Sequence, residues 1–145
     1  MARRLKGRQG DRCGRLAPPI ATPTVDTDDL PPVFAFNLMQ PGYTLEQCRA
    51  GDWPLHFIEA VWRRAQVPWR DIRMQDHRAL GTETLPRRKV ERHPNGTSVP
   101  DHIKKDEAIL VMRFGESGRM VGVRRGRLFQ VIWLDTCMKL YDHGA

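Results

Sequence analysis

The chain has 145 residues, enough for one domain of ordinary size and a tail. Its 24 Lys and Arg residues outnumber its 17 Asp and Glu residues, and this excess of positive charge favours a polyanionic partner, most often nucleic acid. No apolar run approaches the roughly 18 residues needed to cross a bilayer, so we expect no membrane partner. The three cysteines are far apart and lack the spacing of a disulfide framework or a zinc site, which favours a reducing cytoplasm.

Residues 1–32 differ in composition from the rest of the chain. The first fifteen are basic and lack the apolar stretch of a secretory signal, and the following run is rich in Pro, Thr and Asp. Such a composition cannot bury a core, so we expect a disordered or loosely attached basic, Pro-rich extension ahead of a single α+β domain over residues 33–145. The extension is either an arm that adds nonspecific phosphate contacts or a stretch translated from an upstream start.

A short strand and a capped turn are predicted next. The run VFAFNL at 33–38 is rich in β-branched and aromatic residues, and the Pro-Gly pair at 41–42 predicts a turn behind it. Thr44 and Gln47 have the spacing of a capping box, so a short helix is expected there.

One amphipathic helix is predicted over WPLHFIEAVWRRAQV, residues 53–67. Asp52 stands at its N-cap position, Pro54 lies in the first turn and Pro68 ends the helix. WRDIRMQ, residues 69–75, adds a further turn or two. The apolar side chains at helical spacing are expected to cover the core face of a sheet. They are Phe57, Ile58, Val61, Trp62 and Ala65.

Residues 76–100 are polar, basic and rich in turn-forming residues. An irregular segment of this length in a small domain is either mobile or functional. We expect it to pass over the open face of the sheet, where its charges could join those of the strands. Its charged residues include Arg78, Glu83, Arg87, Arg88, Lys89, Arg92 and His93.

Residues 106–144 have the clearest pattern in the chain. Four short runs rich in β-branched, aromatic and aliphatic residues alternate with turns that contain Gly, Ser, Asp and Thr. This pattern is typical of an antiparallel meander. Together with the predicted helices, it indicates an α+β fold in which N-terminal helices pack on a mainly antiparallel sheet of four to five strands. The runs are EAILVMRFG, RMVGV, RLFQVIWLD and KLYDHG.

The lengths of the loops allow the strand register to be estimated, and the register determines which side chains share a face of this sheet. If residues 124–126 and 135–137 form three-residue loops, Arg119, Val131 and Tyr141 lie in a row. Their face mixes aromatic and cationic side chains, so chemistry is expected there. It carries Arg119, Phe129, Val131, Trp133, Lys139, Tyr141 and His143. The opposite face is the expected core, formed by Met120, Gly122, Leu128, Ile132, Leu134, Met138 and Leu140.

The sequence lacks the patterns of the commoner catalytic centres. Its five histidines do not have the HxH, HxxxH or HExxH spacing of a metal site. Ser98 and Ser117 have no nucleophile-elbow context, and Cys137 lies in a predicted loop without evident activation. The GESG run at 115–118 predicts a hairpin turn rather than a phosphate loop. We therefore expect neither a metal nor a cofactor.

The residues of the mixed face suit metal-free cleavage of RNA. This reaction needs a base for the 2′-hydroxyl proton, an acid for the leaving 5′-oxygen and cations for the phosphorane-like transition state. Arg119 suits the last role, because a guanidinium pairs with phosphate oxygens and keeps its proton. His143 or Glu83 could act as the base, and His143 or Tyr141 as the acid. The residues expected to hold flanking phosphates or splayed bases are Lys139, Arg125, Arg127, Trp133, Arg87 and Arg88.

A purely structural role for the same face is the alternative. In that case Tyr141 and Phe129 are packed cover, Arg119 is a cation at a strand edge, and His143 frays with the C-terminus. Which residues share the face decides between the two interpretations.

The C-terminal third resembles the RelE/ParE/HigB superfamily of toxins from bacterial type II toxin–antitoxin systems. Those are small basic proteins whose N-terminal helices pack on a curved antiparallel sheet. RMVGV is similar to the family's "YRLVY"-like strand, RLFQVIWLD to the apolar strand after it, and KLYDHG to its terminal segment. The resemblance implies that Arg119 takes the place of the phosphate-binding arginine. It gives Tyr141 or His143 the place of the C-terminal catalytic residue.

This resemblance implies a RelE-like fold and a toxin that cleaves messenger RNA, free or bound to the ribosome, as an endoribonuclease (an mRNA interferase, a hydrolase). A cognate antitoxin would then cover the basic face. One branch of the superfamily inhibits DNA gyrase without nuclease chemistry, and that target stays open. The alternatives from other classes are a non-catalytic nucleic-acid-binding protein and a protein-interaction module whose basic face meets an acidic protein.

Overall fold

The structure of the chain, a computed structural model, describes residues 26–93 and 98–143. In these residues the fold is α+β, as predicted. None of the helices in the described part of the chain is long and apolar enough to cross a membrane. The elements, in chain order, are η1 (Thr27–Asp29), β1 (Val33–Ala35), η2 (Leu45–Cys48), α1 (Trp53–Arg64), α2 (Trp69–Met74), β2 (Glu83–Leu85), α3 (Arg87–Glu91), β3 (Ile109–Phe114), β4 (Gly118–Arg125) and β5 (Leu128–Asp135).

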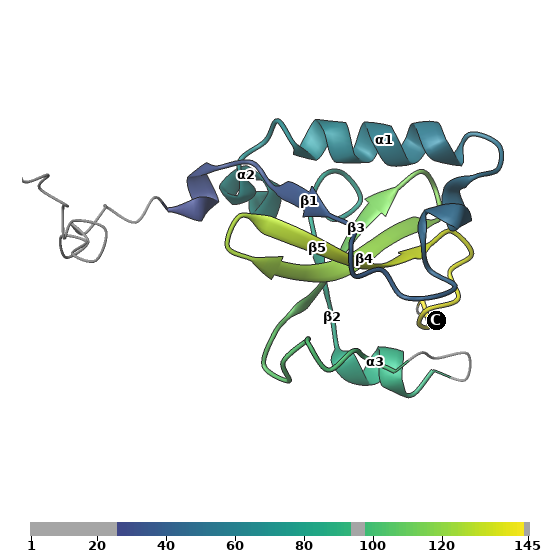
Figure 1. Cartoon of the computed structure of the whole chain (residues 1–145). Helices are drawn as coiled ribbons and strands as arrows, with labels where there is room; N and C mark the ends of the chain where they lie inside the picture. The colour runs from purple at the N-terminus through teal and green to yellow at the C-terminus, as the bar shows by residue number, and fades with distance from the viewer. Residues whose placement is uncertain (1–25, 94–97, 144–145) are drawn as a thin grey trace, which may run out of the picture.

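One mixed sheet of five strands has the order β1-β5-β4-β3-β2. Strands β3, β4 and β5 form the predicted antiparallel meander, β2 pairs antiparallel with β3, and β1 runs parallel to β5. Helix α1 lies over one face of the sheet, and α3 lies on the other side (Figure 1). Strand β2 pairs only with residues 109–111, so the outer edge of β3 at residues 112–114 has no strand beside it in the described ranges.

Of the predicted extension over residues 1–32, the structure describes residues 26–32. Their turn η1 is tied to the domain by ion pairs: Asp28 with Arg124 at 2.8 Å and with Arg73, and Asp29 with Arg70 at 2.5 Å. Residues 1–25 lie outside the described residues, so the extension itself stays a prediction.

The two predicted helix caps have different outcomes. The hydroxyl of Thr44 accepts a hydrogen bond from the backbone N–H of Glu46 at 3.4 Å and caps the turn η2. Asp52 precedes α1 but makes no side-chain cap hydrogen bond, whereas Pro54 occupies the first turn as predicted.

Helix α1 has the predicted position but not the predicted buried stripe. Phe57 and Ala60 pack toward the sheet, and the third position of this stripe is Arg64, which is almost completely buried. Ile58 and Trp62, predicted to be core residues, are 61% and 62% exposed. The prediction was wrong because it assumed that Arg64 faces solvent. It therefore placed the buried face of the helix on the side of Ile58 and Trp62.

The β4–β5 hairpin has a tighter turn than predicted. Strand β4 extends to Arg125, which is paired with Leu128, so the loop consists of residues 126–127 instead of 124–126. Gly126 has φ 61°, the left-handed conformation that short hairpin turns require.

A bulge also shifts the register of this hairpin. Val121 faces Trp133, but the next residue, Gly122, faces Val131, so β5 contributes one extra residue. The two backbones approach closely here, since a Cβ on Gly122 would lie 2.0 Å from the carbonyl oxygen of Gln130. Only glycine fits this position without a shift of the backbone.

The turn and the bulge together change which side chains share a face. Phe129 and Val131, predicted beside Arg119, lie on the α1 face, while Ile132 and Leu140, predicted on the opposite face from Arg119, lie on its side of the sheet. The buried α1 face includes Phe57, Ala60, Trp69, Ile72, Met112, Phe114, Met120, Phe129, Val131 and Leu134. The buried residues of the other face include Leu85, Val90, Val99, Ile103, Ile109, Val111, Val121, Val123, Ile132, Trp133, Leu140 and Tyr141.

The segment predicted to be irregular, residues 76–100, contains two short elements, β2 and α3. Leu85 and Val90 from these elements belong to the same buried cluster as Val121 and Trp133, so the segment covers part of the face opposite α1. This is the face over which the segment was predicted to pass. Residues 94–97 lie outside the described part of the chain.

Candidate functional site

A polar pocket of about 350 Å³ lies beside β4 on the face of the sheet opposite α1. It brings together the three residues predicted to be catalytic, although the predicted register of the strands was wrong. We call it the Arg119 pocket. It is lined by Glu83, Thr84, Leu85, Pro86, Lys89, Arg113, Arg119, Met138, Tyr141, Asp142 and His143.

Arg119 is the buried cation of this pocket. Its side chain comes from the middle strand of the meander and is 4% exposed. One Nη donates to the carbonyl of Gly118 at 3.0 Å, whereas the buried Nε has no hydrogen-bond partner in the described structure. Burial lowers the pKa of Arg119, and the neighbouring charge of Arg113 lowers it further. A buried guanidinium with an unused N–H is suited to an anionic ligand.

Tyr141 and His143 stack beside this guanidinium. Their ring centroids are 4.0 Å apart, and their planes are inclined by 32°. Burial raises the pKa of the Tyr141 hydroxyl, and Glu83 raises it further, so the phenol is protonated at neutral pH. Burial and the charge of Arg119 lower the pKa of His143 below its ordinary value of 6.5, so the imidazole is neutral at pH 7. The buried Nε2 of His143 has no hydrogen-bond partner in the described residues.

The position of Tyr141 and His143 depends on a bend that follows β5. The predicted fourth strand over residues 139–144 is not formed in its described part, residues 139–143, and the described chain after β5 consists of bends and irregular residues. The carboxylate of Asp135 accepts hydrogen bonds from the backbone N–H groups of Cys137 at 3.2 Å and Leu140 at 2.9 Å, which turns the chain out of the extended conformation. Asp135 is therefore a positioning residue that the sequence analysis missed.

Arg113 is a second cation of the pocket and was also missed. It is paired with Arg119 across β3 and β4, its Nη2 lies 3.9 Å from a carboxylate oxygen of Glu83, and its buried Nε has no hydrogen-bond partner among the described groups. The sequence held a signal for it, because the hairpin turn over residues 115–117 places residue 113 opposite residue 119.

Three of the predicted phosphate-binding cations lie outside the Arg119 pocket. Lys139 has its Nζ 5.0 Å from the ring centroid of Tyr43. Arg125 pairs with Glu107 at 3.0 Å. This hydrogen bond raises the pKa of Arg125, although partial burial of the side chain acts in the opposite direction. The Nε of Arg127 donates to the carbonyl of residue 31 at 2.7 Å.

The remaining predicted substrate-binding residues are Trp133, Arg87 and Arg88. Trp133 is fully buried, so its indole has no surface for stacking on a base in this structure. Arg87 pairs with Glu91 at 2.8 Å and donates to the carbonyl of Ile103 at 3.0 Å, whereas Arg88 is exposed on α3. Of this set, only Arg88 has an exposed side chain near the Pro86–Lys89 wall of the pocket.

Within residues 26–93 and 98–143, no three His, Cys, Asp or Glu side chains are grouped so that they could hold a metal ion. No known protein family, curated protein or solved structure matches the chain. Its function is therefore inferred from the geometry and electrostatics of the Arg119 pocket.

Proposed function

We propose that the chain is a metal-independent endoribonuclease whose active site is the Arg119 pocket. The observation that supports this proposal is the convergence of a buried guanidinium, a protonated phenol and a neutral imidazole on one pocket of about 350 Å³. These are the three kinds of group that cleavage of RNA by its own 2′-hydroxyl requires.

His143 is assigned as the general base. In the reaction its Nε2 takes the proton of the 2′-hydroxyl, and the 2′-oxygen attacks the adjacent phosphorus. An imidazole can accept this proton only in its neutral form, and the lowered pKa of His143 keeps it neutral at pH 7. Glu83 suits the role less well, because its carboxylate is exposed and lies beside the guanidinium of Arg113.

Tyr141 is assigned as the general acid and Arg119 as the phosphate-binding cation. The hydroxyl of Tyr141 gives its proton to the leaving 5′-oxygen as the P–O bond breaks, and its raised pKa keeps that proton in place at neutral pH. Arg119 and Arg113 stabilise the negative charge that accumulates on the phosphorane oxygens. The products are a 2′,3′-cyclic phosphate and a 5′-hydroxyl.

We also propose that this nuclease is a RelE-like toxin of a type II toxin–antitoxin system, with messenger RNA as its substrate and an antitoxin protein as its partner. The support comes from the resemblance of residues 106–144 to that superfamily and from helices that precede an antiparallel meander in the chain order. The formal net charge of +7 fits both an RNA substrate and an acidic protein partner.

The direct test is cleavage of a mixed-sequence RNA by the purified full chain in EDTA. We expect products that end in 2′,3′-cyclic phosphate, and a loss of about 10²–10⁴-fold in rate for His143→Gln, the usual contribution of a general base. His102→Gln, which changes an exposed histidine away from the pocket, is the matched control. Full activity of an Arg119→Ala/His143→Ala double variant that is folded would refute the site.

Induced expression in a bacterial host tests the biological setting. Growth arrest with fragmented messenger RNA would support the toxin proposal, and arrest with intact RNA would favour a gyrase-type target. Unchanged growth and salt-dependent binding without turnover would favour the non-catalytic nucleic-acid-binding alternative.

A further inference from the structure

A second hollow adjoins the Arg119 pocket. It has a volume of about 220 Å³ and lies between α1, residues 78–80 and the end of β3. Arg113 lines both hollows, so they meet at this residue. Four arginines and a single carboxylate line the second hollow, which we call the basic pocket. Its charged residues are Glu59, Arg63, Arg64, Arg78 and Arg113.

The four arginines of the basic pocket differ in their partners. Arg64 is buried and uses four of its five N–H donors on backbone carbonyls, so it contributes mainly its charge. Arg63 is paired with Glu59 at 2.6 Å. Arg78 is exposed, and Arg113 has a buried Nε without a hydrogen-bond partner in the described structure. An anion would therefore be held by Arg78 and Arg113 in the field of Arg64.

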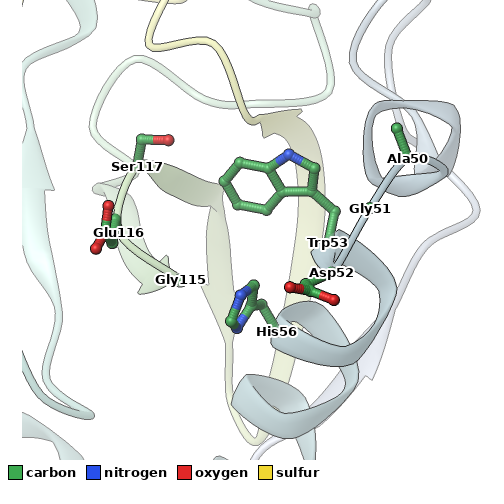
Figure 2. Close-up of a pocket in the computed structure, with 8 residues that line it drawn as sticks. All are labelled: Ala50, Gly51, Asp52, Trp53, His56, Gly115, Glu116 and Ser117. Atoms are coloured by element: carbon green, nitrogen blue, oxygen red, sulfur yellow. The ribbon is translucent and has the colours of Figure 1, made fainter.

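A third hollow, of about 500 Å³, continues from the basic pocket and shares His56 and Gly115 with it. Figure 2 shows the indole of Trp53 in this hollow, between the turn at residues 115–117 and the start of α1, with His56 beside it. We call it the Trp53 pocket. The indole is held edge-on by Phe114, with ring centroids 5.7 Å apart and planes at 77°.

The three pockets are adjacent around one open edge of the sheet. The Arg119 pocket lies on the face opposite α1, and the other two lie on the α1 side. Between them is the outer edge of β3 at residues 112–114, which has no strand beside it in the described structure. Arg113 lies on this open edge and lines the hollows on both sides of it.

We propose that the three pockets form one groove for single-stranded RNA. The scissile phosphate occupies the Arg119 pocket, a neighbouring phosphate occupies the basic pocket at Arg78 and Arg113, and a base of the same strand stacks on Trp53. Phosphodiesters alternating with flat aromatic bases match cationic pockets followed by a half-buried aromatic ring that lines a hollow. The carboxylates of Asp52 and Glu116 in the Trp53 pocket suit the amino groups of a base rather than a phosphate. This inference rests on the proposed function, since it extends the substrate site of the same reaction.

The test is equilibrium binding of a fluorescent 2′-O-methyl RNA octamer of mixed sequence, which cannot be cleaved because its 2′-oxygens are blocked. We expect Trp53→Ala to weaken binding by at least about fivefold, the lower end of what a base–aromatic stack contributes. Trp62→Ala removes an exposed indole from the outer side of α1 and is the matched control, which should bind as the wild type does. Trp53→Leu keeps an apolar side chain against Phe114 and serves if the alanine variant does not fold.

The salt dependence of binding tests the basic pocket separately. Loss of one phosphate contact should reduce the slope of log Kd against log salt by about 0.7 for a single strand. We expect this change for Arg78→Ala, and at least this change for Arg113→Ala, because Arg113 also lines the Arg119 pocket. Arg127→Ala, at the opposite end of β4, should leave the slope unchanged.

The results separate this inference from the proposed function. Binding that depends on Trp53 and Arg78, without any cleavage of ordinary RNA, would support the groove and refute the nuclease. Cleavage with equal octamer affinity for the Trp53→Ala and Trp62→Ala variants would refute the groove and leave the nuclease standing. Absence of octamer binding at low salt would refute the groove outright.

Discussion

Arg64 provides the sharpest test of the packing described here. It is a cation buried to 1% exposure in the α1 stripe, and burial lowers its pKa to about 10, so it stays protonated at neutral pH. Among the described residues, no carboxylate accepts its hydrogen bonds. Its acceptors are the carbonyls of Ala60, Ala79, Leu80 and Arg113, at 3.1 to 3.3 Å. These bonds join α1, the 79–80 segment and β3.

Substitution of Arg64 by Ala should remove a large part of the free energy of unfolding. Each carbonyl left without a partner in a buried site costs about 1–3 kcal/mol. Three of the four carbonyls lie outside α1, and water can reach those that are only partly buried. We therefore expect a total loss of about 3–5 kcal/mol, the range for breaking a buried charged network.

Urea unfolding followed by tryptophan fluorescence measures this loss. Arg63→Ala is the matched control, because its guanidinium is more than half exposed and makes one ion pair on the surface of the same helix. Such a pair contributes about 0–1 kcal/mol. Arg64→Lys should recover part of the stability but not all of it, because an ammonium cannot span four carbonyls. If Arg64→Ala and Arg63→Ala unfold within about 1 kcal/mol of each other, the carbonyl network is not what holds α1 to the sheet.

Three further outcomes follow from the site and the sheet. The acid side of the pH–rate profile should have its midpoint below pH 6.5, because the pKa of the base His143 is lowered, and the rate should not fall on the alkaline side until above pH 10, where Tyr141 ionises; an acid-side midpoint at or above pH 6.5 would contradict these assignments. Gly122→Ala should destabilise the fold by about 1–3 kcal/mol or more, because its Cβ would meet the carbonyl of Gln130 at the bulge, and thermal unfolding measures this loss. Dialysis against EDTA should leave cleavage unchanged, and restoration of activity by an added divalent cation would overturn the metal-free mechanism.

The elements that were predictable are those whose pattern depends on local sequence alone. The runs that became β3, β4 and β5 alternate with turn residues, and Pro54 and Pro68 bracket α1, so their existence and order could be inferred. The buried face of α1 could not be predicted in this way, because an arginine counts as polar in any hydrophobic pattern. Whether Arg64 is buried depends on carbonyls that come from residues 79, 80 and 113, far from it in the chain.

The candidate site was predicted from residue types rather than from correct geometry. Arg119, Tyr141 and His143 meet in one pocket, but through a bend where a strand was expected. The bulge at Gly122 and the capture of two backbone N–H groups by Asp135 decide this geometry. The bulge depends on the missing side chain of Gly122, and the bend depends on the side chain of Asp135. The periodicity of apolar residues predicts neither feature.

The bend after β5 has a consequence for how the protein would lose activity. Two of the three proposed catalytic residues stand on a short segment that pairs with no strand in the described structure. It is held by the Asp135 carboxylate, by the burial of Leu140 and Tyr141, and by an ion pair of His93 with Asp142 at 3.2 Å. Opening of such a segment requires far less free energy than unfolding of the whole domain. Heat or mild denaturant should therefore disable the enzyme while the sheet and α1 remain native. In hydrogen exchange, the amides of residues 137–143 should open well before those of β4.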